Sequence, residues 1–391
     1  MLTLLVFSLT LFAAVLMSDL AHRSLLSTAV LFLGVGLAVG PAGLGVLHLE
    51  LGDPLVKDLA VIALVAVLFS DGMRVRLSDL RRAWSLPARA LLIGMPLTLG
   101  IVAVLAHLVT GLSWGDAFLL GAVLSPTDPV FASGILGRQE IPARLRRLLN
   151  VESGLNDGLA FPLVVVFLTL QGAGRHGLAS LVADLVAGVA IGIGVPFVAA
   201  RLERLRVFTV SVQHESIAAI AVILAVVSAC ELVGANEFLG AFAAGAMMAS
   251  TRPDWHAAYR QVGEPVAEVL KLAAVLVFGV LLSSSILASV SWHGWLFVAA
   301  VLLVARPLAI HVAFVRSALP RTEVAIASWF GPKGFASLVF GLKVLEHGTP
   351  ATTRIFALVA ATVVASILAH GSTDVPIARW YSRHHTKAVD R

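Results

Sequence analysis

Charged side chains are scarce in this sequence of 391 residues, because Asp, Glu, Lys and Arg together make up only 13% of it. A soluble domain carries about 25% charged residues, which cover its surface with groups that water solvates. Hydrophobic residues reach 59%, and the mean hydropathy is +0.94. The composition therefore excludes a water-soluble globular domain. It predicts an all-α polytopic membrane protein, in which helices satisfy their own backbone groups inside the lipid bilayer.

Cysteine is almost absent as well. The one cysteine, Cys230, lies inside an apolar run, so the sequence excludes an intrachain disulfide and a cysteine-rich metal site. The net charge of +5 does not predict a nucleic-acid partner, because the basic residues are distributed among short loops. The apolar run at 2–17 lacks the basic start and the small-residue cleavage site of a signal peptide, and it is therefore predicted to be the first membrane helix.

Long apolar segments follow one another along the whole chain. Segments of roughly 17–25 residues, ending at charged residues, Gly or Pro, predict about 13 membrane helices. Their expected ranges are 2–17, 25–40, 57–70, 87–109, 114–136, 149–170, 178–200, 215–233, 237–250, 265–288, 293–315, 322–345 and 352–371. Because this number is odd, the two termini are expected on opposite sides of the membrane.

Lysine and arginine are distributed unevenly between the two sets of loops. If the N-terminus lies outside, 21 of the 28 basic residues fall on the inside. Only Lys57, Arg175 and Arg354 then fall on the outside, and the other four lie within the spans. Cytoplasmic loops of membrane proteins carry the excess of Lys and Arg. The sequence therefore predicts a cell (inner) membrane protein with its N-terminus outside and its C-terminus in the cytoplasm.

Two of the predicted helices contain residues that interrupt a helix near mid-membrane. In the segment 114–136, Pro126 and Pro129 disfavour helical geometry at the residues before them. In the segment 322–345, the sequence Gly-Pro-Lys-Gly at 331–334 has the same effect. The predicted helices four to six and eleven to thirteen start on opposite sides, and each set is broken in its second member. Such inverted repeats with broken helices are typical of secondary transporters, although two ordinary proline kinks remain an alternative.

Four polar side chains of the segment 149–170 share one helix face. At about 100° per residue, Glu152, Asn156, Ser153 and Asp157 lie within an arc of about 140°. Ionisable groups inside a membrane face protein or water rather than lipid. This face is therefore expected to point into the protein, toward Thr127 and Asp128 in the break of the preceding helix.

The charges that are expected near the breaks do not balance. Three acids, Glu152, Asp128 and Asp157, face two cations, Arg306 and Lys333. Arg306 requires an acid partner because it cannot lose its proton. If Arg306 pairs with Glu152, and if Asp128 and Lys333 offset the dipoles of the broken helices, the surplus acid is Asp157.

A surplus carboxylate in a partly desolvated site can hold either a proton or a hard cation. The hydroxyl of Ser153 and the carbonyl of Thr127 would add oxygen ligands suited to Na⁺ or Li⁺. Hydrogen bonds that serve helix packing alone are the alternative explanation. Packing requires residues such as Ser and Asn, however, and does not require five charges.

Five segments resemble the bacterial Na⁺/H⁺ antiporters of the monovalent cation:proton antiporter-1 family, the NhaP-like exchangers. They are SPTDPVFAS (125–133), VESGLNDG (151–158), FLGAFAAGAMM (238–248), ARP (305–307) and GPKG (331–334). The resemblance implies a homodimer that works by elevator-like alternating access. It implies a core domain of 87–172 and 291–373, a dimerisation domain of 1–86 and 173–290, and a short cytoplasmic tail of 374–391.

The resemblance also implies roles for the site residues. Asp157 would bind cation or proton, Ser153 and the Thr127 carbonyl would help to coordinate the ion, and Asn156 would orient the site. Glu152 would pair with Arg306, and Asp128 and Lys333 would balance the helix breaks. Lys333 is a departure, because relatives more often have Arg there, and Lys lacks the planar fork.

The sequence thus predicts an electroneutral antiporter that exchanges Na⁺ or Li⁺ for H⁺ one for one and has no cofactor. The pair Asn156-Asp157, in place of two adjacent aspartates, resembles the electroneutral branch of the family. A K⁺/H⁺ antiporter with the same mechanism is the alternative that no residue excludes. A cation channel is disfavoured because a channel needs a continuous pore, and it usually has symmetric filter loops. An enzyme is disfavoured because no intramembrane His or Lys base adjoins Ser153 in the sequence.

Overall fold

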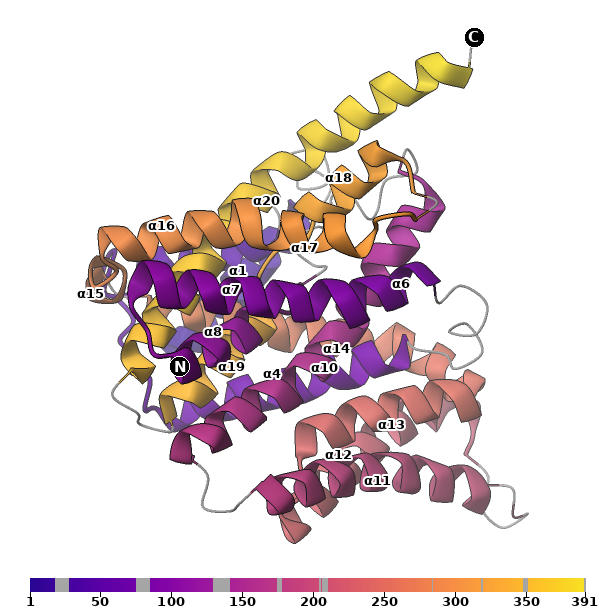
Figure 1. Ribbon diagram of the computed structural model, residues 1–391. Helices are drawn as coiled ribbons and strands as arrows, with labels where there is room; N and C mark the ends of the chain where they lie inside the picture. Colours follow the sequence, from indigo (N-terminus) through magenta and orange to yellow (C-terminus); the bar gives the residue numbers. More distant parts are fainter. Residues whose placement is uncertain are drawn as a thin grey trace. The chain divides into compact units, whose positions relative to one another are not determined.

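The structure is a computed structural model, and every regular element in the part that it describes is helical (Figure 1). The described residues are 1–17, 28–74, 85–128, 141–173, 178–203, 205, 210–282, 284–317, 319–346 and 351–389. The prediction of an all-α protein is therefore confirmed. Six described segments are long and apolar enough to span a membrane: Ser85–Thr110, Ala143–Gln171, Ala179–Leu202, Val212–Val233, Trp292–Ala313 and Thr352–Tyr381. The number of thirteen spans stays a prediction.

The structure describes the following helical elements. In chain order they are α1 (Leu2–Leu16), α3 (Thr28–Val39), α4 (Pro54–Met73), α6 (Ser85–Arg89), η1 (Ala90–Gly94), α7 (Met95–Thr110), α8 (Trp114–Leu124), α10 (Ala143–Leu168), η3 (Thr169–Ala173), α11 (Leu178–Leu202), η4 (Val212–His214), α12 (Glu215–Val233), α13 (Glu237–Thr251), α14 (Pro253–Leu281), α15 (Ser284–Ala288), α16 (Trp292–Ala300), η5 (Val301–Ala305), α17 (Arg306–Ala313), α18 (Arg321–Trp329), α19 (Phe335–Glu346) and α20 (Thr352–Val389). The elements η1, η3 and η5 are π-helical turns, and η4 is a 3₁₀ turn.

The chain divides into two compact units, which are described separately. Unit 1 consists of Met1–Lys57, Leu86–Ser153 and Leu272–Arg391. In this unit α7 packs against α8 and α16, and α20 packs against α8, α16 and α19. Figure 1 shows α16 and α17 running alongside α7. Both predicted breaks lie in this unit, at the end of α8 and between α18 and α19.

Unit 2 consists of Asp58–Ser85 and Gly154–Lys271. Here α11, α12 and α13 pack side by side (Figure 1). The ring of Phe161 in α10 contacts the ring of Phe238 in α13, with centroids 4.7 Å apart. The hydroxyls of Ser70 and Tyr259 lie 2.8 Å apart and are buried, which joins α4 to α14. Unit 2 thus contains a packed core of its own, and the domain boundaries inferred from the family stay a prediction.

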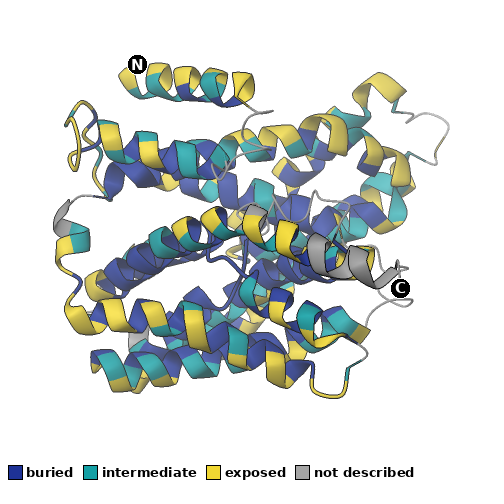
Figure 2. Cartoon of the chain, turned by 90° about the horizontal axis from the view of Figure 1, so that it is seen from above, coloured by how far each residue is buried: buried dark blue, intermediate teal, exposed yellow. Residues whose placement is uncertain are grey.

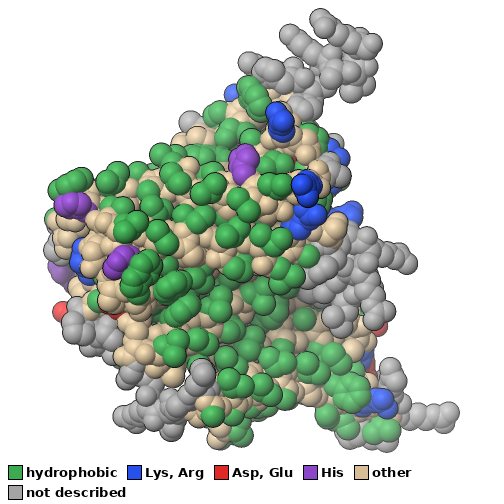
Figure 3. All heavy atoms as spheres, viewed as in Figure 1, with side chains coloured by type: hydrophobic (Ala, Val, Ile, Leu, Met, Phe, Trp, Pro, Cys, Tyr) green, Lys and Arg blue, Asp and Glu red, His purple; other side chains and the backbone are tan. Residues whose placement is uncertain are grey.

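Apolar side chains cover much of the outside of the helices. Figure 2 shows exposed faces that alternate with buried faces along most helices, and Figure 3 shows hydrophobic side chains over most of the face in view. Exposed residues include large apolar ones such as Leu108, Leu232 and Leu303. Water does not solvate such side chains, so the surface is suited to lipid.

Several helix ends differ from the predicted ones. α20 continues to Val389, whereas the sequence pattern predicted an end at 371 followed by a tail. The one proline after 371, Pro376, lies inside the helix, so it does not end it. The predicted span 265–288 is also different, because α14 begins earlier, at Pro253, and ends at Leu281. Hydrophobicity marks where lipid can surround a helix and not where the helix itself begins or ends.

Candidate functional site

The second break separates α18 from α19 and is buried. Residues 330–334 are non-helical, and all five are buried. Pro332 lacks a backbone N–H and disfavours helical geometry at Gly331, which accounts for the end of α18. A Cβ at Gly331 would overlap the guanidinium of Arg306, and a Cβ at Gly334 would overlap the carboxylate of Asp128. Only glycine therefore allows these charged groups to reach the backbone of the break.

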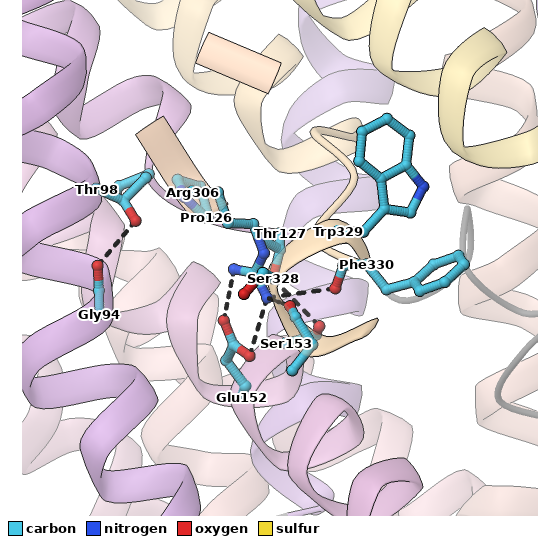
Figure 4. A network of polar contacts seen from close by, with 12 residues as sticks. Gly94, Thr98, Pro126, Thr127, Glu152, Ser153, Arg306, Ser328, Trp329 and Phe330 are labelled. Carbon is cyan, nitrogen blue, oxygen red and sulfur yellow. Dashed lines mark hydrogen bonds and ion pairs between the residues drawn. The ribbon is translucent and has the colours of Figure 1, made fainter. Parts of the chain in front are cut away.

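Arg306 and Glu152 form a buried ion pair beside this break (Figure 4). Nη1 of Arg306 lies 2.7 Å from Oε1 of Glu152, and Nη2 lies 3.1 Å from Oε2. Nη2 also donates to the carbonyls of Ala327 and Phe330, at 3.2 and 3.3 Å. The guanidinium thus joins α10 to the last carbonyls of α18, where a positive charge is favourable.

Lys333 extends from the second break to the first. Its ammonium donates to the carbonyls of Ser125 and Pro126, at 3.3 and 3.2 Å, just beyond the end of α8. The side chain is only 1% exposed. A cation at these carbonyls offsets the negative end of the α8 dipole. Lys333 thus contacts the first break, and its role in balancing the charges of the breaks stays a prediction.

Asp128 makes the reciprocal contact, from the first break to the second. Its backbone N–H donates to the carbonyl of Pro332 at 2.8 Å, and its carboxylate accepts from the N–H of Phe335 at 3.1 Å. Phe335 is the first residue of α19, where a negative charge is favourable. Each break therefore supplies a charged side chain that binds the backbone at the other break. The continuation of the first break, with Pro129, lies outside the described residues.

Thr127 and Ser153 bring two hydroxyls together next to these charges. Their side-chain oxygens lie 3.3 Å apart, and both residues are buried (Figure 4). Ser153 follows Glu152 on α10, so the ion pair and the hydroxyl pair are adjacent on one helix. The Thr127 carbonyl belongs to the same non-helical segment as the carbonyls that Lys333 contacts.

Asn156 and Asp157 lie about one turn further along α10. This helix is continuous from Ala143 to Leu168, despite Pro162. Both residues are buried, with 2% and 4% of their surface exposed. Because the helix is uninterrupted, Asp157 follows Ser153 on the same side of α10, as the periodicity predicts.

Two residues of α20 also contact the second break, and the sequence analysis missed both. Ser366 and His370 are buried and bind the backbone of Lys333 and Trp329. Neither carries a permanent charge, so a search for intramembrane charges does not find them. Their spacing of four residues in an apolar helix, with Thr362 one turn earlier, is the signal that could have found them.

Comparison with known proteins identifies the family. A family model described as "Sodium/hydrogen exchanger, transmembrane" matches residues 7–380. The chain belongs to the sodium/hydrogen exchanger family. This membership identifies the chain as a secondary-transporter homologue and not as an enzyme.

Relatives and solved structures agree with this membership. The exchanger-family chain is 26% identical over 387 residues to the K⁺/H⁺ antiporter NhaP of Alkalimonas amylolytica, covering 97% of this chain and 67% of the relative. It is 26% identical over 381 residues to the K⁺/H⁺ antiporter NhaP2 of Shewanella sp. (strain MR-4), covering 94% and 64%. The chain thus spans about two thirds of the length of these relatives.

The fold matches a solved exchanger structure. The sodium proton antiporter MjNhaP1 from Methanocaldococcus jannaschii superimposes with a TM-score of 0.77 at 18% identity, covering 98% of this chain and 99% of that chain. At this identity the likeness shows the fold, which is the antiporter fold that the family resemblance and the two broken helices predicted.

Proposed function

We propose that the chain is a secondary active transporter that exchanges Na⁺ or Li⁺ for H⁺ across the membrane. Membership of the exchanger family and the antiporter fold support the proposal. The observation that carries it is the position of Asp157, one turn after Ser153 on an uninterrupted helix. This helix supplies a carboxylate and a hydroxyl on one side, within a family of cation and proton carriers.

The proposed cycle depends on competition for the Asp157 carboxylate. Either a proton or a monovalent cation neutralises it, and the loaded site avoids the cost of carrying a net charge through the bilayer. Ser153 and the Thr127 carbonyl would supply further oxygen ligands for the cation, and Asn156 would orient the site. Alternating access by an elevator-like movement follows from the family resemblance. Na⁺, Li⁺ and H⁺ are substrates in this cycle.

Exchange of K⁺ for H⁺ is the second candidate function. The specific observation that favours it is that the two relatives named above are K⁺/H⁺ antiporters. The same carboxylate and oxygen ligands would serve a K⁺ ion, so the two functions differ in selectivity and share a mechanism.

Purified protein in proteoliposomes tests both candidates. Dissipation of a pH gradient is recorded with Na⁺, Li⁺ and K⁺ in turn. Asp157→Asn should abolish exchange of every cation while the protein stays folded, because an amide holds neither the proton nor the cation charge. Asp116→Asn, at a half-buried acid near the start of α8 whose carboxylate accepts from the Ser113 hydroxyl, is the control and should keep exchange. Exchange at the wild-type rate by Asp157→Asn would exclude this residue as the carrier.

The proposed stoichiometry of one to one has a separate test. Asn156 carries no proton, so one carboxylate limits the cycle to one proton per cation. A membrane potential contributes about 2.3 kcal/mol per transferred charge per 100 mV. With the potential clamped by valinomycin and K⁺, the Na⁺-driven proton movement should reach the same equilibrium at 0 and at about −100 mV. A shift of that equilibrium with potential would mean that the cycle moves net charge.

We also propose an inner-membrane homodimer with its N-terminus outside and its C-terminus in the cytoplasm. The distribution of basic residues supports the orientation, and the family resemblance supports the dimer. A fluorescent protein fused after Arg391 should fluoresce in cells, whereas alkaline phosphatase at the same position should be inactive. The reverse result would invert the topology. Mass measurement in detergent should give twice the chain mass, and a monomer would contradict the dimer.

A further inference from the structure

One face of α20 contacts both sides of the second break. The hydroxyl of Ser366 accepts the backbone N–H of Lys333 at 2.7 Å. One turn later, Nε2 of His370 lies 2.9 Å from the carbonyl of Trp329. The hydroxyl of Thr373 then accepts the indole N–H of Trp329 at 2.9 Å. The spacing of four and three residues places these side chains on one stripe of the helix.

Ser366 and His370 also contact each other on this stripe. His370 Nδ1 lies 3.1 Å from the hydroxyl of Ser366. The same Nδ1 lies 2.7 Å from the backbone carbonyl of Ser366, so both ring nitrogens of His370 face a carbonyl acceptor, and Nε2 is placed to donate to that of Trp329. The Ser366 oxygen in turn accepts from Lys333. His370 thus contacts a buried carbonyl at the end of α18, and Ser366 accepts a buried N–H before α19.

Lys333 connects this stripe to the residues of the proposed ion site. The same Lys333 whose N–H binds Ser366 sends its ammonium to the carbonyls of Ser125 and Pro126. Those carbonyls immediately precede Thr127, whose hydroxyl lies 3.3 Å from that of Ser153. A displacement of the Lys333 backbone would move its ammonium, and with it the non-helical segment that contains the Thr127 carbonyl.

We propose that Ser366 and His370 are positioning residues for ion binding: they fix the backbone of the second break and, through Lys333, the Thr127 carbonyl. This inference rests on the proposed antiport function. It assigns a role in ion affinity to a helix that contributes no charge to the site. Ser366 and His370 are 0% and 2% exposed, so the stripe is withdrawn from solvent.

The first experiment compares the deletion of two hydroxyls on α20 in the proteoliposome assay. Ser366→Ala removes the acceptor for Lys333 N–H and leaves a buried donor unsatisfied. It should raise the apparent KM for the transported cation about tenfold, with a smaller change in the maximal rate. Thr362→Val is the matched control, because Thr362 is equally buried but its hydroxyl donates to Leu358 within its own helix. It should leave KM unchanged.

The second experiment tests the imidazole by a conservative substitution. His370→Gln keeps an N–H donor near the Nε2 position and should retain a KM close to that of the wild type. His370→Leu fills similar space without a donor and should raise KM as Ser366→Ala does. This pair keeps the proposal testable if Ser366→Ala does not yield folded protein. Equal KM values for Gln and Leu variants would overturn the role of the imidazole as a donor.

Hydrogen exchange provides a readout that does not depend on transport. Deuterium uptake of peptides covering 329–335 should rise in Ser366→Ala and stay unchanged in Thr362→Val. Wild-type uptake and KM in Ser366→Ala, or the same changes in Thr362→Val, would overturn the proposal. Raised uptake with an unchanged KM would also overturn it, because α20 would then stabilise the break without positioning the ion site. If the wild type exchanges no cation, the antiport function fails, and the positioning proposal that rests on it falls with it.

Discussion

Unit 1 contains two Arg–Glu pairs that look alike in geometry and differ in burial. In the inner pair, Arg306 binds Glu152 through two hydrogen bonds, and the side chains are 6% and 5% exposed. In the outer pair, Arg144 binds Glu323 through two hydrogen bonds at 2.8 and 2.5 Å, but its side chain is 52% exposed while that of Glu323 is 2% exposed. Each pair joins α10 to another helix segment, α17 in the first case and α18 in the second.

The difference in burial determines which charged group is left without a partner or solvent when the other member of the pair is removed. Loss of either inner partner leaves a charge buried in protein, which costs far more than the Coulomb attraction alone. In the outer pair, Arg144 can turn toward solvent when Glu323 is removed. Glu323, however, stays buried when Arg144 is removed, and among the described residues it then retains the long contact of 3.4 Å with the Tyr381 hydroxyl. In the inner pair, the loss of either partner is therefore expected to destabilise the protein strongly. In the outer pair, the loss of Arg144 is expected to destabilise it more than the loss of Glu323.

The largest effect is expected at the inner pair. Arg306→Ala and Glu152→Ala should each lower the free energy of unfolding by about 3–5 kcal/mol, because each leaves an uncompensated buried charge. The double variant should cost less than the sum of the two. Thermal unfolding in mild detergent measures all three. Additive losses would show that the two side chains do not act as a pair.

Gly331→Ala tests whether the inner pair requires the close approach of Arg306 to the backbone at Gly331. The added methyl would overlap the Arg306 guanidinium and force it away from Glu152. We expect a loss of about 3 kcal/mol, at the upper end of the usual cost of overpacking. Gly100→Ala in α7 is the matched control, because no atom lies near its Cβ, and it should be neutral or stabilising. An equal melting temperature for both variants would contradict the close approach of Arg306.

The outer pair should show the one-sided dependence. Arg144→Ala should cost about 2 kcal/mol, because Glu323 is left with a poorly satisfied buried carboxylate. Glu323→Gln should lower the free energy of unfolding by less, because water can solvate the exposed guanidinium of Arg144. The order of the two melting temperatures is the test. If Glu323→Gln is the more destabilising, the exposure of Arg144 does not control the energetics of the pair.

The smallest effect is expected at a surface pair on α19. Nζ of Lys343 lies 3.3 Å from Oε2 of Glu346, three residues later in the chain, and both side chains are partly exposed. Lys343→Ala should change the free energy of unfolding by less than about 0.5 kcal/mol. This variant sets the baseline for the other three. A loss of several kcal/mol here would mean that burial is not what distinguishes the pairs.

The sequence predicted those features that depend on local chemistry. Proline and glycine marked both breaks, and the fixed charge of Arg306 required an acid, which the structure provides as Glu152. The all-helical fold was predicted correctly from apolar length, and the antiporter fold was predicted correctly from the family resemblance together with the two breaks. Each of these inferences uses a property of one residue type or of one short segment.

Contacts between segments that are far apart in the sequence could not be predicted in this way. Arg144 is one of the 21 basic residues that the sequence assigns to the inside, and nothing in its neighbourhood indicates its partner Glu323, which is 179 residues away. Ser366 and His370 are uncharged polar residues in an apolar helix, and their importance comes from the backbone groups of the break. The role of Asp157 as the ion carrier stays a prediction, because it concerns binding and not folding.

The π-helical turn η5 ends immediately before Arg306. A π turn contains one residue more than an α turn, so the residues after it are rotated by about 100° relative to a regular helix. Deletion of one residue from Val301–Ala305 would let this segment close as a regular α turn, with the guanidinium still facing Glu152. Closing the turn as a regular helix without a deletion would instead rotate the guanidinium away from Glu152. A relative with a single-residue gap at this point can therefore retain the same ion pair.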